Sequence, residues 1–418
     1  MSSAHSSQPT VGSGSFATIG AVSAAHFMSH VLQLALAPLL PLLHREFDVS
    51  FTQLGLVLTV FYATSGSGQW LAGVLVDRFG PHRVLLAGLA LQGAAVAAMG
   101  LAPGYWALLP LAFLAGAGNS VFHPADLAIL SQRVEKARLG RAFSAHVIGG
   151  AAGYAVSPVL IALIATTWGW RPAIMVAGLL ALALCALLFA GRAAIRVDDA
   201  AGPSAPGTAA ASQEGAAGPV RFAQILATPV VLFAFGYFTL TATSNFGVYS
   251  FGITALTEGY DVALALATIV VGLYQLGNIA GVLLGGMLAD RSSRHDRIAM
   301  AGMAAAGTLM LGAGSFADPL VGVFVLLIGS GFASGVTLPS RDLLVRQAAS
   351  NRALGRVFGI VYSGFDVGAL VAPLIYGLLL DHGAAQWVFL AAAIPLFLAI
   401  ATVAGFAPQP VREPAPAE

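Results

Sequence analysis

Long runs of apolar residues, separated by short stretches with charge, Gly or Pro, occupy most of this 418-residue chain. Only 9% of the residues are charged, whereas a soluble domain has about 25%. Because so little charge cannot cover a water-facing surface, lipid is the expected solvent for most of the chain. A helix that crosses a bilayer needs roughly 20 mostly apolar residues. We therefore predict an all-α membrane protein with twelve transmembrane helices, at 17–43, 53–75, 83–101, 105–131, 139–165, 171–191, 224–256, 262–288, 297–316, 319–347, 353–380 and 385–407.

The segment between the sixth and seventh predicted helices differs in composition from the rest. Residues 192–223 are rich in Ala, Gly, Ser and Pro, which is typical of a flexible linker. We predict that this linker separates an N-terminal six-helix bundle at 17–191 from a C-terminal six-helix bundle at 224–407. Residues 1–16 are predicted to form a disordered N-terminal tail without a signal-peptide pattern, and residues 408–418 a C-terminal tail.

Lys and Arg are distributed unevenly over the predicted loops. With the N-terminus inside the cell, the cytoplasmic segments hold nearly all of these residues, and the opposite side has only Arg45 and Arg171. Cytoplasmic loops of membrane proteins carry the excess of positive charge. Both termini are therefore predicted to be cytoplasmic.

The two predicted bundles carry the same sequence features in the same order. Such repetition is how many transporters are built, from two halves related by an axis along the membrane normal. The features repeat at an offset of 213 or 215 residues: Gly73, Asp77 and Arg78 as Gly286, Asp290 and Arg291; Pro124 as Pro339; LGRAF (139–143) as LGRVF (354–358); and Gly149, Gly153 and Pro158 as Gly364, Gly368 and Pro373.

The stretch GVLVDRFGPHR at 73–83 has the pattern G-x-L-x-D-R-x-G-x-x-R and resembles the signature loop of the major facilitator superfamily. The resemblance implies two pseudo-symmetric six-helix bundles that work by alternating access. It also implies that Asp77 braces the halves near the start of the eleventh helix, where a helix N-terminus attracts negative charge. A solvated loop that only sets the topology is the alternative. The expected gating residues are Gly73, Asp77, Arg78, Gly80, Arg83, Asp126, Asp290, Arg291, Arg341 and Asp342.

The fourth predicted helix contains SVFHP at 120–124 and resembles the fosmidomycin-resistance branch of that superfamily. The resemblance implies a bacterial inner-membrane carrier that exports a small organic molecule or drug as a proton-coupled antiporter, and that acts as a monomer. Ala112 stands where drug antiporters of the superfamily carry an arginine. Proton-coupled uptake or exchange of a small metabolite therefore remains an alternative.

Polar residues inside the predicted helices are few, and such residues usually face a bundle interior. His26, His30 and Gln33 share one face of the first helix. The resemblance implies that the first, fourth, seventh and tenth helices line a central cavity. The role of the two histidines is open. They could contact substrate, handle protons, bind a metal, or be neutral and hydrogen-bonded by neighbouring helices. The expected cavity residues are His26, His30, Gln33, His123, Tyr237, Thr241, Asn245, Tyr274, Gln275 and Asn278.

Asp366 is predicted to lie about 15 Å inside the membrane, since it follows the start of its helix by roughly ten residues at 1.5 Å each. Desolvation disfavours the charged form of a carboxyl group. Asp366 is therefore the main candidate for carrying a coupling proton, with His146 and His30 as further candidates. A hydrogen bond to a neighbour such as Tyr362 is the alternative role.

Two further features suggest how the halves interact. Asp126 follows Pro124, and Arg341 follows the matching Pro339, so Arg341 is a candidate partner of Asp126 when the cytoplasmic side closes. An ordinary network within one helix is the alternative. The pairs Gly149/Gly153 and Gly364/Gly368 allow close helix approach in lipid. We expect them to pack against helices of the other half, unless they serve small-residue packing alone.

No motif indicates an enzyme, because nucleophile-elbow, zinc-protease and phosphate-loop patterns are missing from the sequence. We predict no cofactor and no nucleic-acid partner for a chain of net charge +1. Cys185 is the single cysteine, and we assign no metal site from sequence. Two other classes stay open: a transition-metal or metal-chelate carrier that uses His26, His30, His123 and His146, and a non-transporting receptor.

Overall fold

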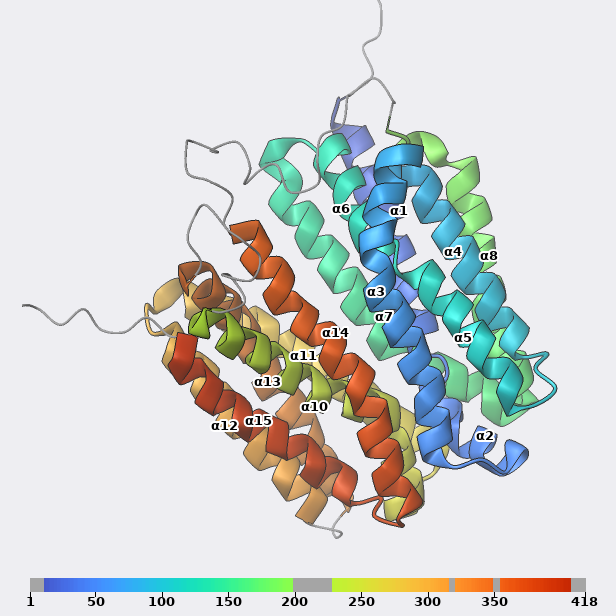
Figure 1. Ribbon diagram of the computed structural model, residues 1–418, viewed down its shortest axis with the longest axis vertical. Coiled ribbons are helices and arrows are strands. Elements are labelled where there is room, and N and C mark those ends of the chain that lie inside the picture. The colour runs from blue at the N-terminus through green and yellow to red at the C-terminus, as the bar shows by residue number, and fades with distance from the viewer. Residues whose placement is uncertain (1–10, 198–227, 316–319, 349–353, 407–418) are drawn as a thin grey trace, which may run out of the picture. The chain divides into compact units, whose positions relative to one another are not determined.

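The computed structural model describes residues 11–197, 228–315, 320–348 and 354–406 (Figure 1). These ranges are helical and contain no strand, as predicted. Helices lie at all twelve predicted positions. The first, at 17–43, is interrupted after Gln33, and the fourth is in two pieces. The helices are α1 (Val11–Gln33), η1 (Ala37–Leu39), α2 (Leu40–Phe47), α3 (Phe51–Phe79), α4 (Pro81–Met99), α5 (Tyr105–Asn119), α6 (Phe122–Arg133), η2 (Lys136–Arg138), α7 (Leu139–Trp168), α8 (Trp170–Ala190), η3 (Arg192–Ala194), α10 (Pro229–Tyr260), α11 (Leu264–Arg291), α12 (His295–Ser315), α13 (Leu320–Ala348), α14 (Leu354–Asp381) and α15 (Trp387–Phe406).

Ten segments of the described residues are long and apolar enough to cross a membrane. Helix α3 is not one of them. The helix itself is continuous, but the polar stretch TSGSGQ at 64–69 interrupts its apolar run. The apolar part of α15, Trp387–Val403, is slightly short. Both helices nevertheless occupy positions predicted for spans.

The described chain packs as two compact units. The first unit holds α1 to α8 and one end each of α10, α11 and α14, and the second holds the remaining helices. Residues 198–223 of the predicted linker, residues 1–10 of the predicted N-terminal tail and residues 408–418 fall outside the described residues, so the predicted domain boundaries stay a prediction. Helix α1 begins at Val11, so residues 11–16 of the tail predicted to be disordered are helical. The first unit is Met1–Pro206, Tyr249–Gln275 and Pro373–Ala385, and the second is Gly207–Val248, Leu276–Ala372 and Gln386–Glu418.

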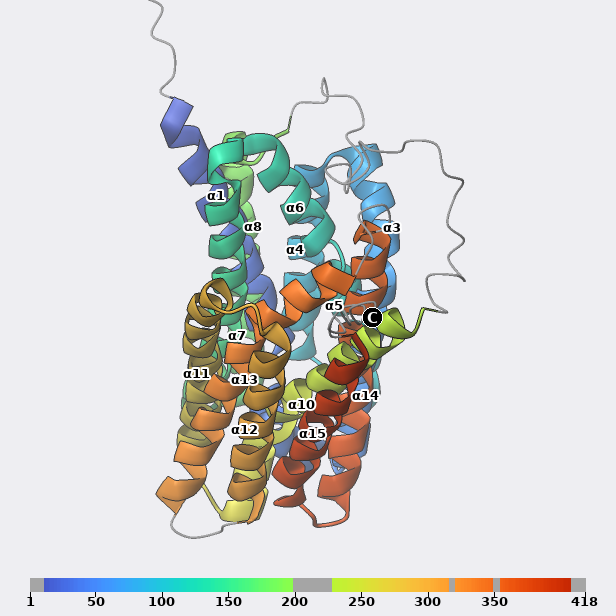
Figure 2. The same cartoon turned by 90° about the vertical axis from the view of Figure 1, so that its left-hand side faces the viewer.

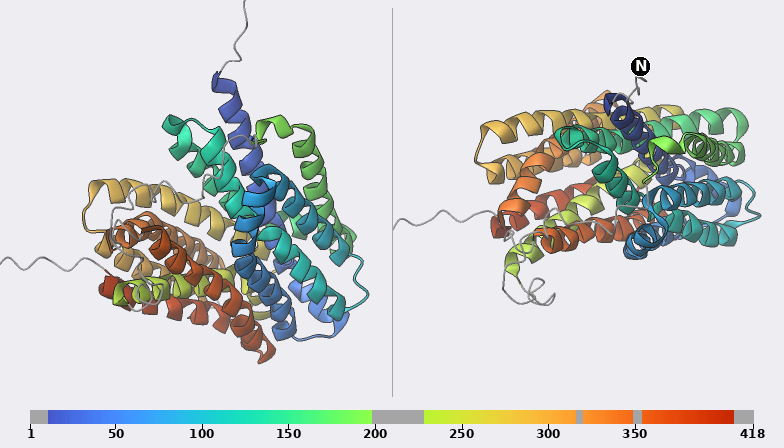
Figure 3. Two further views of the ribbon diagram at one scale, coloured as in Figure 1. Left: turned by 45° about the horizontal axis from the view of Figure 1, so that its top comes forward. Right: turned by 90° about the horizontal axis from the view of Figure 1, so that it is seen from above.

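Each unit contains both parallel and antiparallel helix neighbours. Helix α7 runs parallel to α1, because Gly149 and Gly153 of α7 meet Ser23 and Phe27 of α1 in the same order. In the first unit α1 lies along α7, and α4 lies along α8 and α5 (Figures 1 and 2). In the second unit α12 lies along both α13 and α15, which Figure 3 shows from two further directions.

The signature stretch is helical rather than a loop, which corrects the sequence-based expectation. Helix α3 continues to Phe79 and α4 begins at Pro81, so Asp77 and Arg78 lie in the last turn of α3. Gly80 alone makes the turn, with a φ of 84° that favours glycine. Asp290 and Arg291 likewise end α11.

The fourth predicted span breaks between Asn119 and Phe122. Pro124 then lies in the first turn of α6, where a missing backbone N–H leaves no helical bond unmade. Its repeat partner Pro339 lies inside the uninterrupted helix α13. The matched prolines therefore have different structural effects in the two halves.

The repeated glycine pairs pack against helices of their own half, so the expectation of partners in the other half was wrong. A Cβ atom on Gly153 would clash with the carbonyl oxygen of Phe27 on α1. In α14, a Cβ on Gly368 would lie 2.5 Å from the carbonyl oxygen of Thr239 on α10. Only glycine permits such an approach between two helix backbones.

Within the first unit, the end of α14 packs against the start of α3. The carboxylate of Asp381 accepts hydrogen bonds from the backbone N–H groups of Phe51 (2.6 Å) and Thr52 (2.9 Å). These N–H groups have no partner within α3, so the contact caps the helix and is favoured by its dipole. Nearby, Arg45 forms an ion pair with Glu258 of α10 at 3.0 Å.

Candidate functional site

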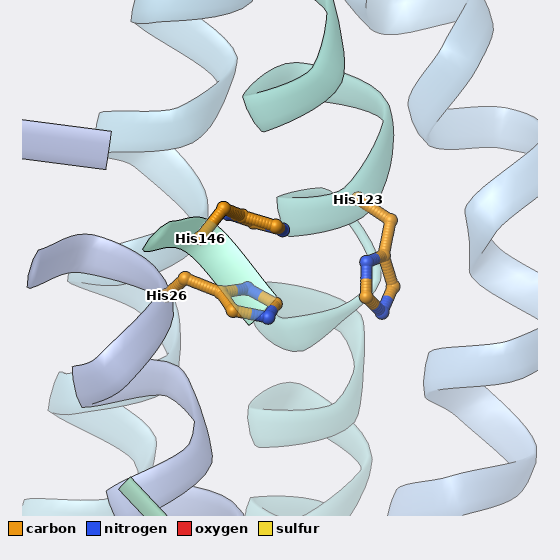
Figure 4. A group of neighbouring side chains, drawn as sticks. All are labelled: His26, His123 and His146. Carbon is orange, nitrogen blue, oxygen red and sulfur yellow. The ribbon is translucent and has the colours of Figure 1, made fainter. Parts of the chain in front are cut away.

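Four ionisable side chains from three helices converge inside the first unit. His26 lies on α1, His123 and Asp126 lie on α6, and His146 lies on α7. One ring nitrogen of each histidine lies within 4.8 Å of the others, and Figure 4 shows the three imidazoles turned towards one another. The Nδ1 atoms of His26 and His146 lie 3.4 Å and 3.7 Å from the same carboxylate oxygen of Asp126. We call these four residues the histidine cluster.

The cluster is largely closed off by the surrounding helices. Asp126 is 0% exposed, His26 and His146 are buried, and His123 is exposed. Neither carboxylate oxygen of Asp126 has a hydrogen-bond partner among the described residues. An ionised carboxylate without a partner is strongly disfavoured in an apolar interior. A proton, a protonated imidazole or a bound cation must therefore neutralise it.

Glycine on α7 makes room for the imidazoles of α1. A Cβ atom on Gly150 would lie 2.7 Å from two ring atoms of His26 and 2.9 Å from a ring atom of His30. The same face of α7 carries His146, whose ring stacks on that of His26 with centroids 3.8 Å apart. Close helix approach and imidazole stacking therefore depend on each other.

The polar region continues along α1 through His30. Its ring lies 4.4 Å from that of His26 and 4.1 Å from that of Tyr154, centroid to centroid. The ring centroid of Tyr154 lies 5.7 Å from that of Tyr249, and the ring centroid of Tyr249 lies 5.9 Å from that of Tyr274. Tyr154 of α7 thus touches a predicted site residue directly.

Gln33, the third residue of the predicted polar face, does not join the histidine cluster. Its side chain interacts with Tyr62 of α3 instead. His26 and His30 therefore meet α7, while the next polar residue of α1 turns to a different helix.

A second polar group in the first unit was missed by sequence reasoning. The side chain of Gln92 donates to Asn119 Oδ1 (3.2 Å) and to the carbonyl oxygen of Ser29 (3.3 Å). Asn119 donates to the hydroxyl of Ser65 at 2.8 Å. Gln92 and Asn119 stand in mostly apolar runs, and Ser65 lies in the polar stretch at 64–69, which are the only signals in the sequence. Their meeting depends on the packing of α4 against α5.

Asp126, expected among the gating residues, does not pair with the signature arginines Arg78 and Arg83 in the described structure. Asp126 lies against His26 and His146. The guanidinium of Arg78 lies 5.2 Å from the ring of Phe79, and Arg83 donates to the carbonyl oxygen of Phe79 at 3.4 Å. Asp126 thus belongs to the histidine cluster.

The second unit carries its own buried charge. Arg341 on α13 forms an ion pair with the adjacent Asp342 at 2.9 Å, and its guanidinium lies 4.2 Å from the ring of Phe238 on α10. The hydroxyl of Tyr362 donates to the same oxygen of Asp342 at 3.1 Å. This network joins α10, α13 and α14 of the second unit, whereas the alternative given for Arg341 was a network within one helix. A pair between Arg341 and Asp126 stays a prediction.

The other predicted cavity residues are mostly satisfied by neighbouring helices. Tyr237 donates to Thr337 (3.4 Å), and Thr241 bonds the backbone of its own helix. Asn278 donates to the carbonyl oxygen of Gly331 (3.3 Å). Asn245 and Gln275 are buried. Their role as cavity lining stays a prediction.

The signature residues of both halves lie at helix ends and face outward. The side chains of Asp77, Arg78, Asp290 and Arg291 are exposed. A Cβ atom on Gly73 or Gly286 would meet nothing within 4 Å, so packing in the described structure does not explain these glycines. Their gating role stays a prediction.

A family model for the Major Facilitator Superfamily matches residues 22–254 and again residues 239–418. This chain belongs to the major facilitator superfamily. It is therefore a multi-pass membrane transporter protein by family, and it is not an enzyme.

The chain is similar to several proteins over nearly its whole length. It is 27% identical to the fosmidomycin resistance protein of Escherichia coli, covering 91% of each chain, and 26% identical to a probable sulfoacetate transporter of Cupriavidus necator, covering 87% of each. A solved bacterial homologue of the human lysosomal transporter Spinster, in an inward-facing and unoccupied conformation, has the same fold with a TM-score of 0.74. It is 13% identical, and the match covers 96% of this chain and 100% of that one.

Proposed function

We propose that this protein exports a small organic molecule in exchange for protons, by alternating access of two six-helix bundles. We place it in a bacterial inner membrane, as a monomer with both termini in the cytoplasm. The observation that carries the proposal is the histidine cluster, because ionisable groups buried among membrane helices mark substrate and ion pathways. Similarity to a fosmidomycin resistance protein supports export.

We assign the coupling proton to Asp366, with His146 and His30 as further proton carriers. The carboxyl group of Asp366 is half-buried on α14 and has no ion pair or hydrogen bond among the described residues. Tyr362, the neighbour that was its alternative partner, donates to Asp342 instead. A carboxyl in this setting is free to bind and release a proton.

Everted membrane vesicles test the proposal directly. Vesicles with and without the protein receive an acid-inside pH gradient and a panel of labelled small anions, cations and neutral solutes. We expect accumulation of at least one solute, its loss when the gradient is dissipated, and its loss in Asp366→Asn. The control is Asp296→Asn at the start of α12, where the partly exposed carboxylate lies 3.6 Å from Arg294. Accumulation that ignores the gradient would remove proton coupling.

Alternating access predicts that contacts between the first and second repeat break during transport. Asp381 and Thr52 form such a contact, with the carboxylate 2.9 Å from the backbone N–H. In a Cys185→Ala background, a disulfide between Thr52→Cys and Asp381→Cys should stop transport, and reduction should restore it. Each single cysteine variant is the control. Undiminished transport by the oxidised double variant would contradict this arrangement.

Uptake or exchange of a small anion is the second candidate. The buried cation Arg341 in the second unit favours it, since a guanidinium matches carboxylate and sulfonate groups. Right-side-out vesicles given the same panel decide the direction. Gradient-driven accumulation in those vesicles, without accumulation in everted ones, would favour uptake.

A further inference from the structure

We propose that His26, His123, His146 and Asp126 form a binding site for one divalent transition-metal ion of the Zn²⁺ or Co²⁺ type. The site lies inside the first unit, among α1, α6 and α7. Binding concerns the chain itself and does not depend on the direction, substrate or coupling proposed above.

The distances among the donor atoms fit tetrahedral coordination. Zinc binds imidazole nitrogen and carboxylate oxygen at about 2.0–2.2 Å, which places neighbouring ligands of a tetrahedron about 3.4 Å apart. The carboxylate oxygen Oδ2 of Asp126 lies 3.4 Å from His26 Nδ1 and 3.7 Å from His146 Nδ1. One ring nitrogen of each histidine lies within 4.8 Å of the others, and Asp126 adjoins this group through its contacts with His26 and His146. The proposed site requires these side chains to draw together around the ion.

The unmet bonding capacity of the cluster is the second argument. Both oxygens of Asp126 and the Nδ1 atoms of His26 and His146 are buried without hydrogen-bond partners among the described residues. Buried polar atoms in proteins nearly always have a partner. One divalent ion would satisfy the converging donors together and offset the carboxylate charge in an apolar interior.

The donor set also selects the kind of metal. Ca²⁺ and Mg²⁺ favour six or more oxygen ligands, and the cluster offers one carboxylate. Cu⁺ favours sulfur, and the thiol of Cys185 donates to the carbonyl oxygen of Leu86 on α4. Three imidazoles and one carboxylate are typical ligands of Zn²⁺ and Co²⁺. His123 is exposed, which gives an ion a path into the site.

Metal binding by the full chain, purified without a polyhistidine tag, tests the proposal. Titration with Co²⁺ should give the visible absorption of a tetrahedral complex at one ion per chain, and Zn²⁺ should displace it. X-ray absorption on the zinc form should show imidazole and oxygen ligands only. This measurement needs no variant and no transport substrate.

Near-isosteric variants then identify the ligands. His26→Gln, His146→Gln and Asp126→Asn should each weaken Zn²⁺ binding by at least ~100-fold, since losing even an outer partner of a metal site weakens binding by about 10–100-fold. His382 is an exposed histidine just after the end of α14, and His382→Gln should leave Zn²⁺ binding unchanged. Failure of the wild-type chain to bind, or equal binding by all four variants, would overturn the site. Vesicle transport is measured separately, so a failed transporter would leave this result intact.

Discussion

The same positions in the two repeats carry different chemistry on the same helix scaffold. Gly149 packs on the carbonyl of Ser23, and its repeat partner Gly364 packs on that of Phe235. Gly153 and Gly368 similarly pack on Phe27 and Thr239, so the first helices of the two repeats correspond at an offset of 212.

At this offset His26 corresponds to Phe238, and the repeat offset of 215 pairs Asp126 with Arg341. The corresponding side chains touch in both halves. His26 lies 3.4 Å from Asp126, and the ring of Phe238 lies 4.2 Å from the guanidinium of Arg341. His146 corresponds to Val361, which is fully buried. The two repeats thus share the glycine contacts between helix backbones but differ in side chains. The first repeat has the acid Asp126 beside imidazoles, and the second has the cation Arg341 over the ring of Phe238.

The largest expected effect is on the transport rate, and it comes from removing the buried acid of the first repeat, Asp126. Asp126→Asn should slow substrate transport by roughly 100-fold, because removing one partner from a buried charged group is worth about 3 kcal/mol. Initial rates in vesicles, normalised to protein amount, provide the measurement. Asp296→Asn is the control, and equal losses in both variants would contradict a special role for Asp126.

The shared scaffold predicts equal effects in the two halves. Gly153→Ala and Gly368→Ala should each destabilise the protein by about 2 kcal/mol, because an added methyl overpacks a helix contact. Thermal unfolding in detergent measures the effect. Gly140→Ala and Gly359→Ala, whose added Cβ atoms would meet nothing within 4 Å, are the matched controls. A large loss in one half only would break the structural equivalence.

A substitution that removes no polar group tests the placement of the imidazoles. Gly150→Ala should lower the transport rate by about 10-fold, since a Cβ 2.7 Å from the His26 ring forces that ring to turn and about 1.4 kcal/mol corresponds to a factor of ten. Its repeat partner is Phe365, so only the first repeat has this dependence. Transport equal to that of Gly140→Ala would show that the ring position does not matter.

The smallest expected effect concerns the second repeat. Arg341→Lys keeps the charge near Asp342 but loses the planar contact with Phe238, which should reduce stability by about 1 kcal/mol. Thermal unfolding of Arg341→Lys in the wild-type and Phe238→Leu backgrounds measures the coupling. The same loss in both backgrounds would exclude the ring contact as its source.

Much of the fold could be predicted because lipid imposes a simple rule. Ten of the spans show as apolar runs of sufficient length, and the signature motif with its copy indicated the superfamily from the sequence alone. The break between α5 and α6 and the one-residue turn at Gly80 were missed. Both depend on local backbone conformation, which hydrophobicity does not record.

The candidate site was predicted only in part. The spacing of His26 and His30 placed both on one face of α1, and the histidines were chosen because ionisable residues in spans are rare. Asp126 was predicted to belong to a gate. The sequence does not show how close it lies to α1 and α7, so its contacts with His26 and His146 were not foreseen. Gln92 and Asn119 were missed for the same reason.

The amino-acid sequence by itself determined that this chain is a membrane protein, that it has two repeated sets of helices and that it resembles a carrier family. Apolar length and a repeated motif are properties of the linear chain, so no folding is needed to see them. Only the tertiary structure decided which polar side chains meet. That choice depends on how closely α1, α6 and α7 approach, and glycines such as Gly150 set the approach by presenting no side chain.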